Sequence, residues 1–188
     1  MREYFLDLAA QFTQPRTAIA QILGFIPMLL GYFIFRKTTR KNSLTLKTLA
    51  DGISALYFLL LEQWPGCIIN CINIFRGLCF SQRGRKPWAS GIWIPIFFCI
   101  CTVIGSCLGW TGVISLLPML GSCFAVIGYW CNNPTLLRRF NLVGVALWLI
   151  YGIAIFAIPT VVGNIISLTS IAITELRILR EKKENAYD

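Results

Sequence analysis

Two asparagines stand in stretches of the sequence that are otherwise almost entirely apolar. Asn70 and Asn164 are 94 positions apart, and each is followed one helical turn later by a second polar residue, Asn73 or Ser167. A carboxamide donates and accepts hydrogen bonds, so a facing pair can hold hydroxyl or amide groups without requiring charge. The alternative is that both asparagines only hydrogen-bond one helix to another.

Two prolines are candidate hinges. Pro27 and Pro118 each begin the tripeptide Pro-Met-Leu, and they are 91 positions apart. A proline within a helix removes a backbone hydrogen bond and bends the helix. Such bends would suit a protein that opens alternately to two sides, and the alternative is that they only improve packing.

Three charged residues fall inside predicted membrane spans. Asp51 and Arg76 lie at similar depths, and Lys47 is one helical turn from Asp51. Because an unpaired charge within a bilayer is costly, we predict a buried ion pair between Asp51 and Arg76, shared with Lys47. This pair could lock two helices together, bind an anionic substrate or carry a proton.

Most enzyme chemistry lacks its usual residues here. The chain has no histidine, no Gly-x-Ser-x-Gly elbow and no Walker-type phosphate loop. The eight cysteines are scattered through apolar segments, where small buried hydrophobic residues are the default interpretation. We therefore expect no catalytic activity, no metal site and no cofactor.

The composition indicates a polytopic membrane protein. Of the 188 residues 56% are hydrophobic and 13% are charged, and the mean hydropathy is +0.68. Residues 87–137 and 140–174 contain no Asp, Glu, Lys or Arg, and each stretch exceeds the ~20 residues that span a bilayer. Soluble domains and nucleic-acid binders are excluded. The predicted spans are 17–35, 44–61, 67–80, 88–108, 113–131, 140–157 and 159–176.

The distribution of basic residues predicts the orientation. Arg2 and Arg16 fall on one side of the seven spans, and Arg76 falls within the third. By the positive-inside rule the N-terminus is outside and the C-terminus is cytoplasmic. Residues 1–14 are predicted to form an interfacial amphipathic helix, and residues 177–188 a basic cytoplasmic tail. The cytoplasmic basic residues are Arg36, Lys37, Arg40, Lys41, Lys47, Arg83, Arg85, Lys86, Arg138, Arg139, Arg177, Arg180, Lys182 and Lys183.

The chain also contains an internal repeat. Spans in 17–80 resemble those in 113–176, with 88–108 as a linker helix. Four crossings separate the starts of the two copies, so the copies are parallel. The predicted fold is all-α, with two parallel three-helix bundles joined by one helix (3+1+3). Matched pairs are Phe33 with Phe124, Tyr57 with Tyr151, Pro65 with Pro159, Asn70 with Asn164 and Ile72 with Ile166.

This arrangement resembles the SWEET sugar transporters and the PnuC vitamin transporters. Within that group the chain is most similar to the YgjV-type bacterial inner membrane proteins, through residues 116–122, Arg138-Arg139, 148–150 and 164–177. The Pro-Gln dipeptide of many relatives is absent, because Met follows both prolines. The resemblance implies a bacterial inner-membrane location and a central cavity. Its implied lining is Asn70 and Asn164 on the third helix of each triplet, with Ser54 and Trp148 on the second helices.

These observations favour a facilitator for a small polar solute that works by alternating access. Sugars, sugar acids and nucleoside- or vitamin-like compounds all suit the polar residues and the flat face of Trp148. The alternative is a non-transporting receptor or helper subunit. The expected partners are the solute and the lipid bilayer, with a homo-oligomer also possible and no nucleic acid.

Overall fold

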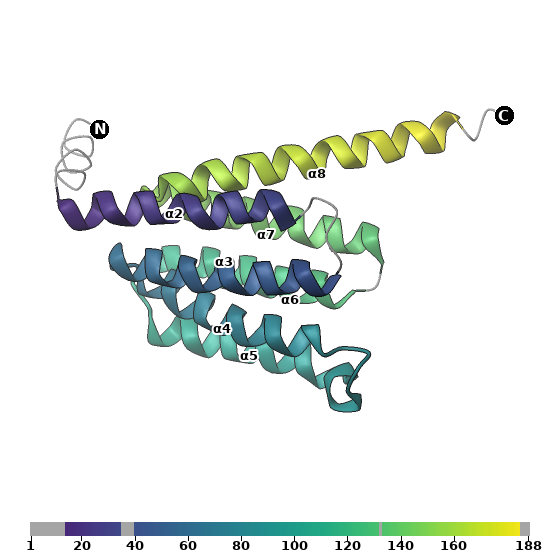
Figure 1. The fold of residues 1–188 in the computed structure, drawn as a ribbon, viewed down its shortest axis with the longest axis horizontal. Helices are drawn as coiled ribbons and strands as arrows, with labels where there is room; N and C mark the ends of the chain where they lie inside the picture. The colour runs from purple at the N-terminus through teal and green to yellow at the C-terminus, as the bar shows by residue number, and fades with distance from the viewer. Residues whose placement is uncertain (1–13, 35–39, 132, 185–188) are drawn as a thin grey trace.

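The computed structural model describes residues 14–34, 40–131 and 133–184, and its regular structure there is entirely helical. The amphipathic helix predicted over residues 1–14 lies outside this range, apart from its last residue. Seven α-helices and two short 3-10 turns follow one another along the described chain (Figure 1). They are α2 (Pro15–Ile34), α3 (Arg40–Leu60), α4 (Trp64–Ser81), η1 (Pro87–Ser90), α5 (Trp93–Leu108), η2 (Val113–Ser115), α6 (Leu116–Trp130), α7 (Pro134–Ala154) and α8 (Ile158–Glu184).

Each predicted span corresponds to one helix, with shifted ends. Helix α7 begins at Pro134, earlier than expected, because Asn133 caps it by accepting a 2.9 Å hydrogen bond from the Thr135 amide. Helix α8 continues to Glu184, so most of the predicted tail 177–188 is helical. The physical reason is that its Glu, Lys, Arg and Leu residues are strong helix formers.

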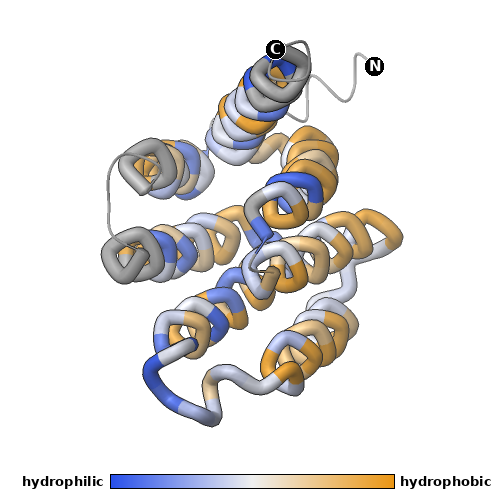
Figure 2. Tube along the Cα trace, turned by 90° about the vertical axis from the view of Figure 1, so that its right-hand side faces the viewer, coloured by the Kyte–Doolittle hydropathy of each residue, from blue (hydrophilic) through white to orange (hydrophobic). Residues whose placement is uncertain are grey.

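Three of these helical segments are long and apolar enough to cross a membrane: residues 113–130, 135–154 and 158–177. Two further apolar segments, 15–30 and 93–108, are shorter. Large apolar side chains point outward over the bundle, including Ile22, Phe75 and Leu108, which are 70%, 64% and 81% exposed. Figure 2 shows the apolar colouring spread over the outside of several helices. A surface of this kind is typical of contact with lipid.

Helices adjacent in the sequence pack against each other in turn from α2 to α8, and further contacts join helices that are distant in the sequence. Helix α2 packs on α8, and α4 packs on α6. The first of these contacts is close, because a Cβ atom added at Gly24 would lie 2.9 Å from Pro159 Cγ. In Figure 1, α2 and α8 cross near the start of α8 and separate toward its C-terminal end.

Two helical hairpins, α3–α4 and α7–α8, are closed by the same turn. Glu62 and Phe156, which are 94 positions apart, both have positive φ angles, of 57° and 54°. The next amide in each turn reaches back five residues: Gln63 N–H bonds Phe58 O at 2.9 Å and Ala157 N–H bonds Gly152 O at 2.8 Å. Positions that are 94 residues apart in the sequence repeat therefore also have the same backbone conformation in these turns.

These two turns lie at the same end of the bundle as the link between α5 and α6, which we call the turn end (Figure 1). The opposite end, where α4 is linked to α5 and where α7 begins, we call the basic end. Basic side chains gather there. Those in described segments include Arg83, Arg85, Lys86, Arg138, Arg139, Arg177 and Arg180.

Candidate functional site

Four aromatic rings meet near the turn end, and we call them the aromatic cluster: Tyr57 and Phe58 of α3, and Trp148 and Tyr151 of α7. The ring centroids of Phe58 and Trp148 are 5.8 Å apart, and those of Trp148 and Tyr151 are 5.7 Å apart. Tyr57 and Tyr151 are fully buried. The cluster therefore fills the space between α3 and α7 with close-packed rings.

The hydroxyl groups of the two tyrosines in the cluster lie at related places in the bundle. The Tyr57 hydroxyl lies beside the Thr160 side chain at the start of α8, and the Tyr151 hydroxyl faces the Gly66 backbone at the start of α4. Positions 66 and 160 are themselves 94 apart. Each hairpin thus places a tyrosine of its first helix against the start of the second helix of the other hairpin.

Helix α2 ties both hairpin turns together at the turn end. The Gln21 amide, which is buried, donates a 2.9 Å hydrogen bond to the Phe156 carbonyl in the α7–α8 turn. Arg16 forms an ion pair with Glu62 in the α3–α4 turn. The Arg16 guanidinium also donates to the Leu59 carbonyl at 3.2 Å. Helix α2 is therefore joined to the two hairpin turns by one buried and one exposed polar contact.

Polar atoms without partners are buried within the described helices. Ser and Thr residues in apolar helices commonly donate to the carbonyl four residues earlier, as Thr102 and Ser167 do here, but Ser106 and Ser122 do not. Each unpaired buried polar group costs about 1–3 kcal/mol. The orphaned atoms are Asp51 Oδ2, Asn73 Oδ1, Arg76 Nη1, Ser106 Oγ, Ser122 Oγ, Tyr151 OH and Asn164 Nδ2.

The ion pair predicted between Asp51 and Arg76 does not form. The predicted contact of Asp51 with Lys47 on the same helix does form, with 2.6 Å between Nζ and Oδ1. The reason is geometric, because residues four apart share a helix face and Lys47 reaches the carboxylate directly. Arg76 lies close enough to interact electrostatically with Asp51, yet it makes no ion pair in the described part of the chain.

Arg76 is enclosed between α4, α5 and α6. Its side chain is buried, with the guanidinium carbon 5.5 Å from the centroid of the Tyr129 ring. The thiols of Cys99 and Cys123, which face each other from α5 and α6, are also close to it. Arg76 is therefore a buried cation among aromatic and weakly polar groups.

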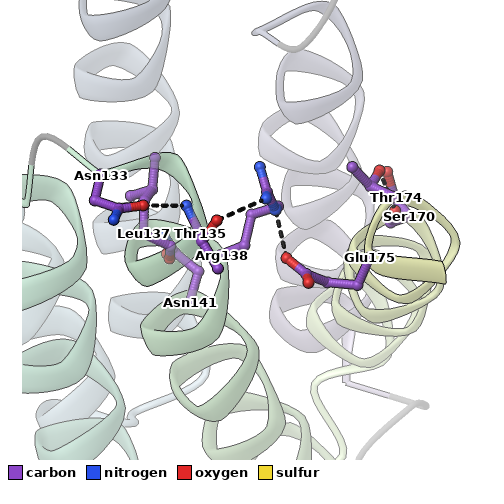
Figure 3. Close-up of polar contacts among 8 residues, drawn as sticks. All are labelled: Asn133, Thr135, Leu137, Arg138, Asn141, Ser170, Thr174 and Glu175. Atoms are coloured by element: carbon purple, nitrogen blue, oxygen red, sulfur yellow. Dashed lines mark hydrogen bonds and ion pairs between the residues drawn. The ribbon is translucent and has the colours of Figure 1, made fainter. Parts of the chain in front are cut away.

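A more exposed ion pair holds α7 to α8 near the basic end. Arg138 of α7 reaches Glu175 of α8, with Nε and Oε1 2.5 Å apart, and its guanidinium also donates to Thr135 Oγ1 at 3.4 Å (Figure 3). Arg83 in the α4–α5 loop lies over the Trp130 ring, 3.9 Å from its centroid. The first contact joins neighbouring helices, and the second joins the α4–α5 loop to the end of α6.

The predicted binding residues occupy different environments. Asn70 is buried and donates a 2.7 Å hydrogen bond to the Gly66 carbonyl of its own helix, whereas the Asn164 amide nitrogen is buried without a partner. Their helices pack mainly on other neighbours, α4 on α3, α5 and α6, and α8 on α7 and α2. A direct meeting of the two asparagines stays a prediction.

The other residues predicted to line the cavity also differ in whether their polar atoms have partners. Trp148 belongs to the aromatic cluster, where Phe58 and Tyr151 pack against it at interplanar angles of 45° and 85°. Ser54 is half-buried on α3. Asn73 is buried with an unpaired carbonyl oxygen, whereas the Ser167 hydroxyl is taken by the Gly163 carbonyl at 2.8 Å. Among the predicted lining residues, Asn73 and Asn164 are thus the ones with a buried polar atom that lacks a hydrogen-bond partner.

The two candidate hinge prolines are not in equivalent places. Pro27 lies inside α2, as the sequence predicts for a bend. Pro118 is the third residue of α6, directly after the 3-10 turn at 113–115. In the first turn of a helix a proline removes no hydrogen bond that the helix would otherwise make. The hinge role stays a prediction, and it has a clear structural basis only at Pro27.

The cysteines are all free thiols, but the expectation that they are buried is wrong. Cys71 and Cys107 are exposed and the other six are half-buried. In a bundle with an apolar exterior, a small and weakly polar thiol is compatible with an outward position. The described residues contain no group of three or more metal-ligating side chains.

Sequence analysis did not single out several polar residues of the interior. Gln21, Ser106, Ser122 and Tyr129 have no counterpart at the offsets of 91 or 94 that defined the repeat. The available signal for Gln21 was a carboxamide within an apolar span, the same signal that identified Asn70. Nothing in the sequence indicated that Arg76 would lie beside an aromatic ring of α6.

The fold and the polar interior together define an all-helical membrane protein. A family model for bacterial inner membrane proteins, Imp-YgjV, matches residues 18–182 of the chain. The chain belongs to this family. No curated protein and no solved structure matches the chain.

Proposed function

We propose that the protein is a facilitator that moves a small polar solute through the interior of the helix bundle by alternating access. The observation that carries this proposal is the set of buried polar atoms without partners. Polar groups within a membrane bundle are expensive and usually serve a pathway or a binding site. A solute that supplies the missing hydrogen bonds would remove that cost while it is bound. The proposal assigns no chemical transformation to these residues.

The arrangement of helices supports a 3+1+3 architecture for this facilitator. In the proposed scheme α2, α3 and α4 form one triplet, α5 is the linker, and α6, α7 and α8 form the other. The contacts α2–α8 and α4–α6 then become equivalent, because each joins the first helix of one triplet to the third helix of the other. The matching turns at Glu62 and Phe156 also support two related copies.

The distribution of charge supports the proposed orientation. The basic end would face the cytoplasm and the turn end the outside, since basic residues concentrate on cytoplasmic loops. The aromatic cluster and the links from α2 would then close the outer side. On this proposal the present conformation is closed to the outside, and transport requires the hairpins to separate at the turn end.

Substitution of Asn164 tests the proposed function. We expect Asn164→Leu to abolish uptake of the transported solute into proteoliposomes, because the side chain loses its unpaired donor. The candidate solutes to be screened are sugars, sugar acids and nucleoside- or vitamin-like compounds. Thermal stabilisation of the purified protein by each compound identifies the solute before uptake is measured.

The matched control for this experiment lies on the same helix. Thr169 is exposed, and its hydroxyl already bonds the Ile165 carbonyl at 2.8 Å. Thr169→Val should therefore leave both binding and uptake unchanged. If Asn164→Leu also leaves both unchanged, the facilitator proposal is wrong and a non-transporting receptor or helper subunit becomes the better explanation.

A further inference from the structure

Arg76 is a buried cation that forms no ion pair with any side chain of the described residues. Only 4% of the residue is exposed, and its Nη1 atom has no hydrogen-bond partner. Asp51, whose charge acts on Arg76, already pairs with Lys47 at 2.6 Å. Two cations and one carboxylate leave one net positive charge at this place.

The carboxylates that pair elsewhere cannot supply the missing charge. Glu62 is engaged by Arg16 near the turn end, and Glu175 by Arg138 near the basic end. A buried cation without a counter-ion loses its hydration and gains no ion-pair energy in exchange. This costs several kcal/mol. The ring of Tyr129 offers only partial compensation, because its centroid is 5.5 Å from the guanidinium carbon.

A buried hydrogen-bond acceptor lies one helical turn from this cation. Asn73 is also on α4, is 7% exposed, and has a buried Oδ1 atom without a donor. The pair thus offers a cationic donor and a neutral acceptor on neighbouring turns of one helix. A complementary ligand has an anionic group for the guanidinium and a hydroxyl or N–H group for the amide oxygen.

We infer that the solute is a monoanion whose carboxylate pairs with Arg76 and whose hydroxyl or N–H group donates to Asn73. This inference rests on the proposed facilitator function and names its substrate class. The planar guanidinium matches a carboxylate through two parallel hydrogen bonds. A single excess positive charge favours a monocarboxylate over a phosphate ester, which carries about 1.5 to 2 negative charges.

The stability of variants tests the charge balance without any ligand. In a low-salt buffer, Arg76→Gln leaves the neutral Lys47–Asp51 pair and should melt at or above the wild-type temperature. Asp51→Asn leaves the buried Arg76 and the half-buried Lys47 without a carboxylate and should melt below it. If Arg76→Gln lowers the melting temperature as much as Asp51→Asn does, Arg76 is a structural partner of Asp51 and the inference is overturned.

Binding of matched probes tests the ligand class. Glucuronate and glucose form one pair, gluconate and sorbitol the other, and the members of each pair differ mainly in the carboxylate. We expect the acid of at least one pair to bind wild-type protein about 10- to 100-fold more tightly than its neutral partner. Arg76→Gln should abolish that difference. Equal responses to acid and neutral members in both pairs overturn the inference.

Two further results separate the possible explanations. Phosphatidylglycerol is the probe for a lipid headgroup as the source of the anion. If Arg76→Gln removes stabilisation by this lipid but leaves the response to the carboxylates intact, the site is a lipid site and the inference is overturned. If the neutral probes are taken up and this uptake requires Asn164, the facilitator proposal stands. The inference that the solute is a monoanion is then wrong.

Discussion

Replacing Gly24 with alanine tests the close contact between α2 and the start of α8. A Cβ atom at this position would lie 2.9 Å from Pro159 Cγ and 2.9 Å from Tyr57 Cε2, so the surrounding atoms must shift. Neither neighbour moves easily, because both Pro159 and Tyr57 are fully buried. Overpacking of this kind costs about 1–3 kcal/mol. Alanine is more favourable than glycine within a helix by roughly 1 kcal/mol, which offsets part of that cost. We expect a net loss of about 1 kcal/mol in the free energy of unfolding.

Gly52 of α3 provides the matched control. A Cβ atom there would meet Ile74 Cδ1 at 3.8 Å, an ordinary contact. Gly52→Ala should therefore stabilise the protein by about 0.5–1 kcal/mol. Unfolding of both variants in detergent, followed by circular dichroism, measures the difference. If Gly24→Ala is as stable as Gly52→Ala, the close packing of α2 on the α7–α8 turn is wrong, and so is the closure described at the turn end.

Three further predictions concern other parts of the bundle. A double-mutant cycle on Arg138 and Glu175, which are 21% and 26% exposed, should give a coupling of about 0.5–1 kcal/mol that falls as salt is added; zero coupling would contradict the pair. In a variant that keeps only Cys99 and Cys123, copper phenanthroline should join α5 to α6, as detected by mass spectrometry, and failure to crosslink would contradict their packing. Green fluorescent protein fused after Glu184 should fluoresce in cells and alkaline phosphatase fused there should be inactive; the reverse pattern would invert the proposed orientation.

Hydrophobicity and the repeat offset were enough to predict the helices and one detail of their geometry. The pairing of Pro65 with Pro159 located both hairpin turns, because proline in the first turn of a helix fixes where that helix begins. The end of α8 was missed for the opposite reason. Its last turns are charged, and a search for apolar spans ends at the first such residue although charged residues continue a helix well.

The site was harder to predict because partner choice depends on packing between helices. Asp51 and Arg76 had suitable depths for an ion pair, but depth says nothing about which face of a helix each residue occupies. The contact with Lys47 was predicted from its i, i+4 spacing, and it forms. Tyr129 could not be predicted as the neighbour of Arg76, since nothing in a single sequence specifies how α4 and α6 are rotated against each other.

The two polar contacts that α2 makes at the turn end differ in their access to water. If this end opens, the more exposed contact should break first. Arg16 and Glu62 have side chains 48% and 69% exposed, so ions in solution weaken their attraction. Gln21 is 7% exposed, so its bond to Phe156 breaks only after water enters between α2 and the hairpins. In the proposed transport cycle, α2 would therefore lose an exposed contact that is sensitive to ionic strength before it loses a buried contact that is sensitive to hydration.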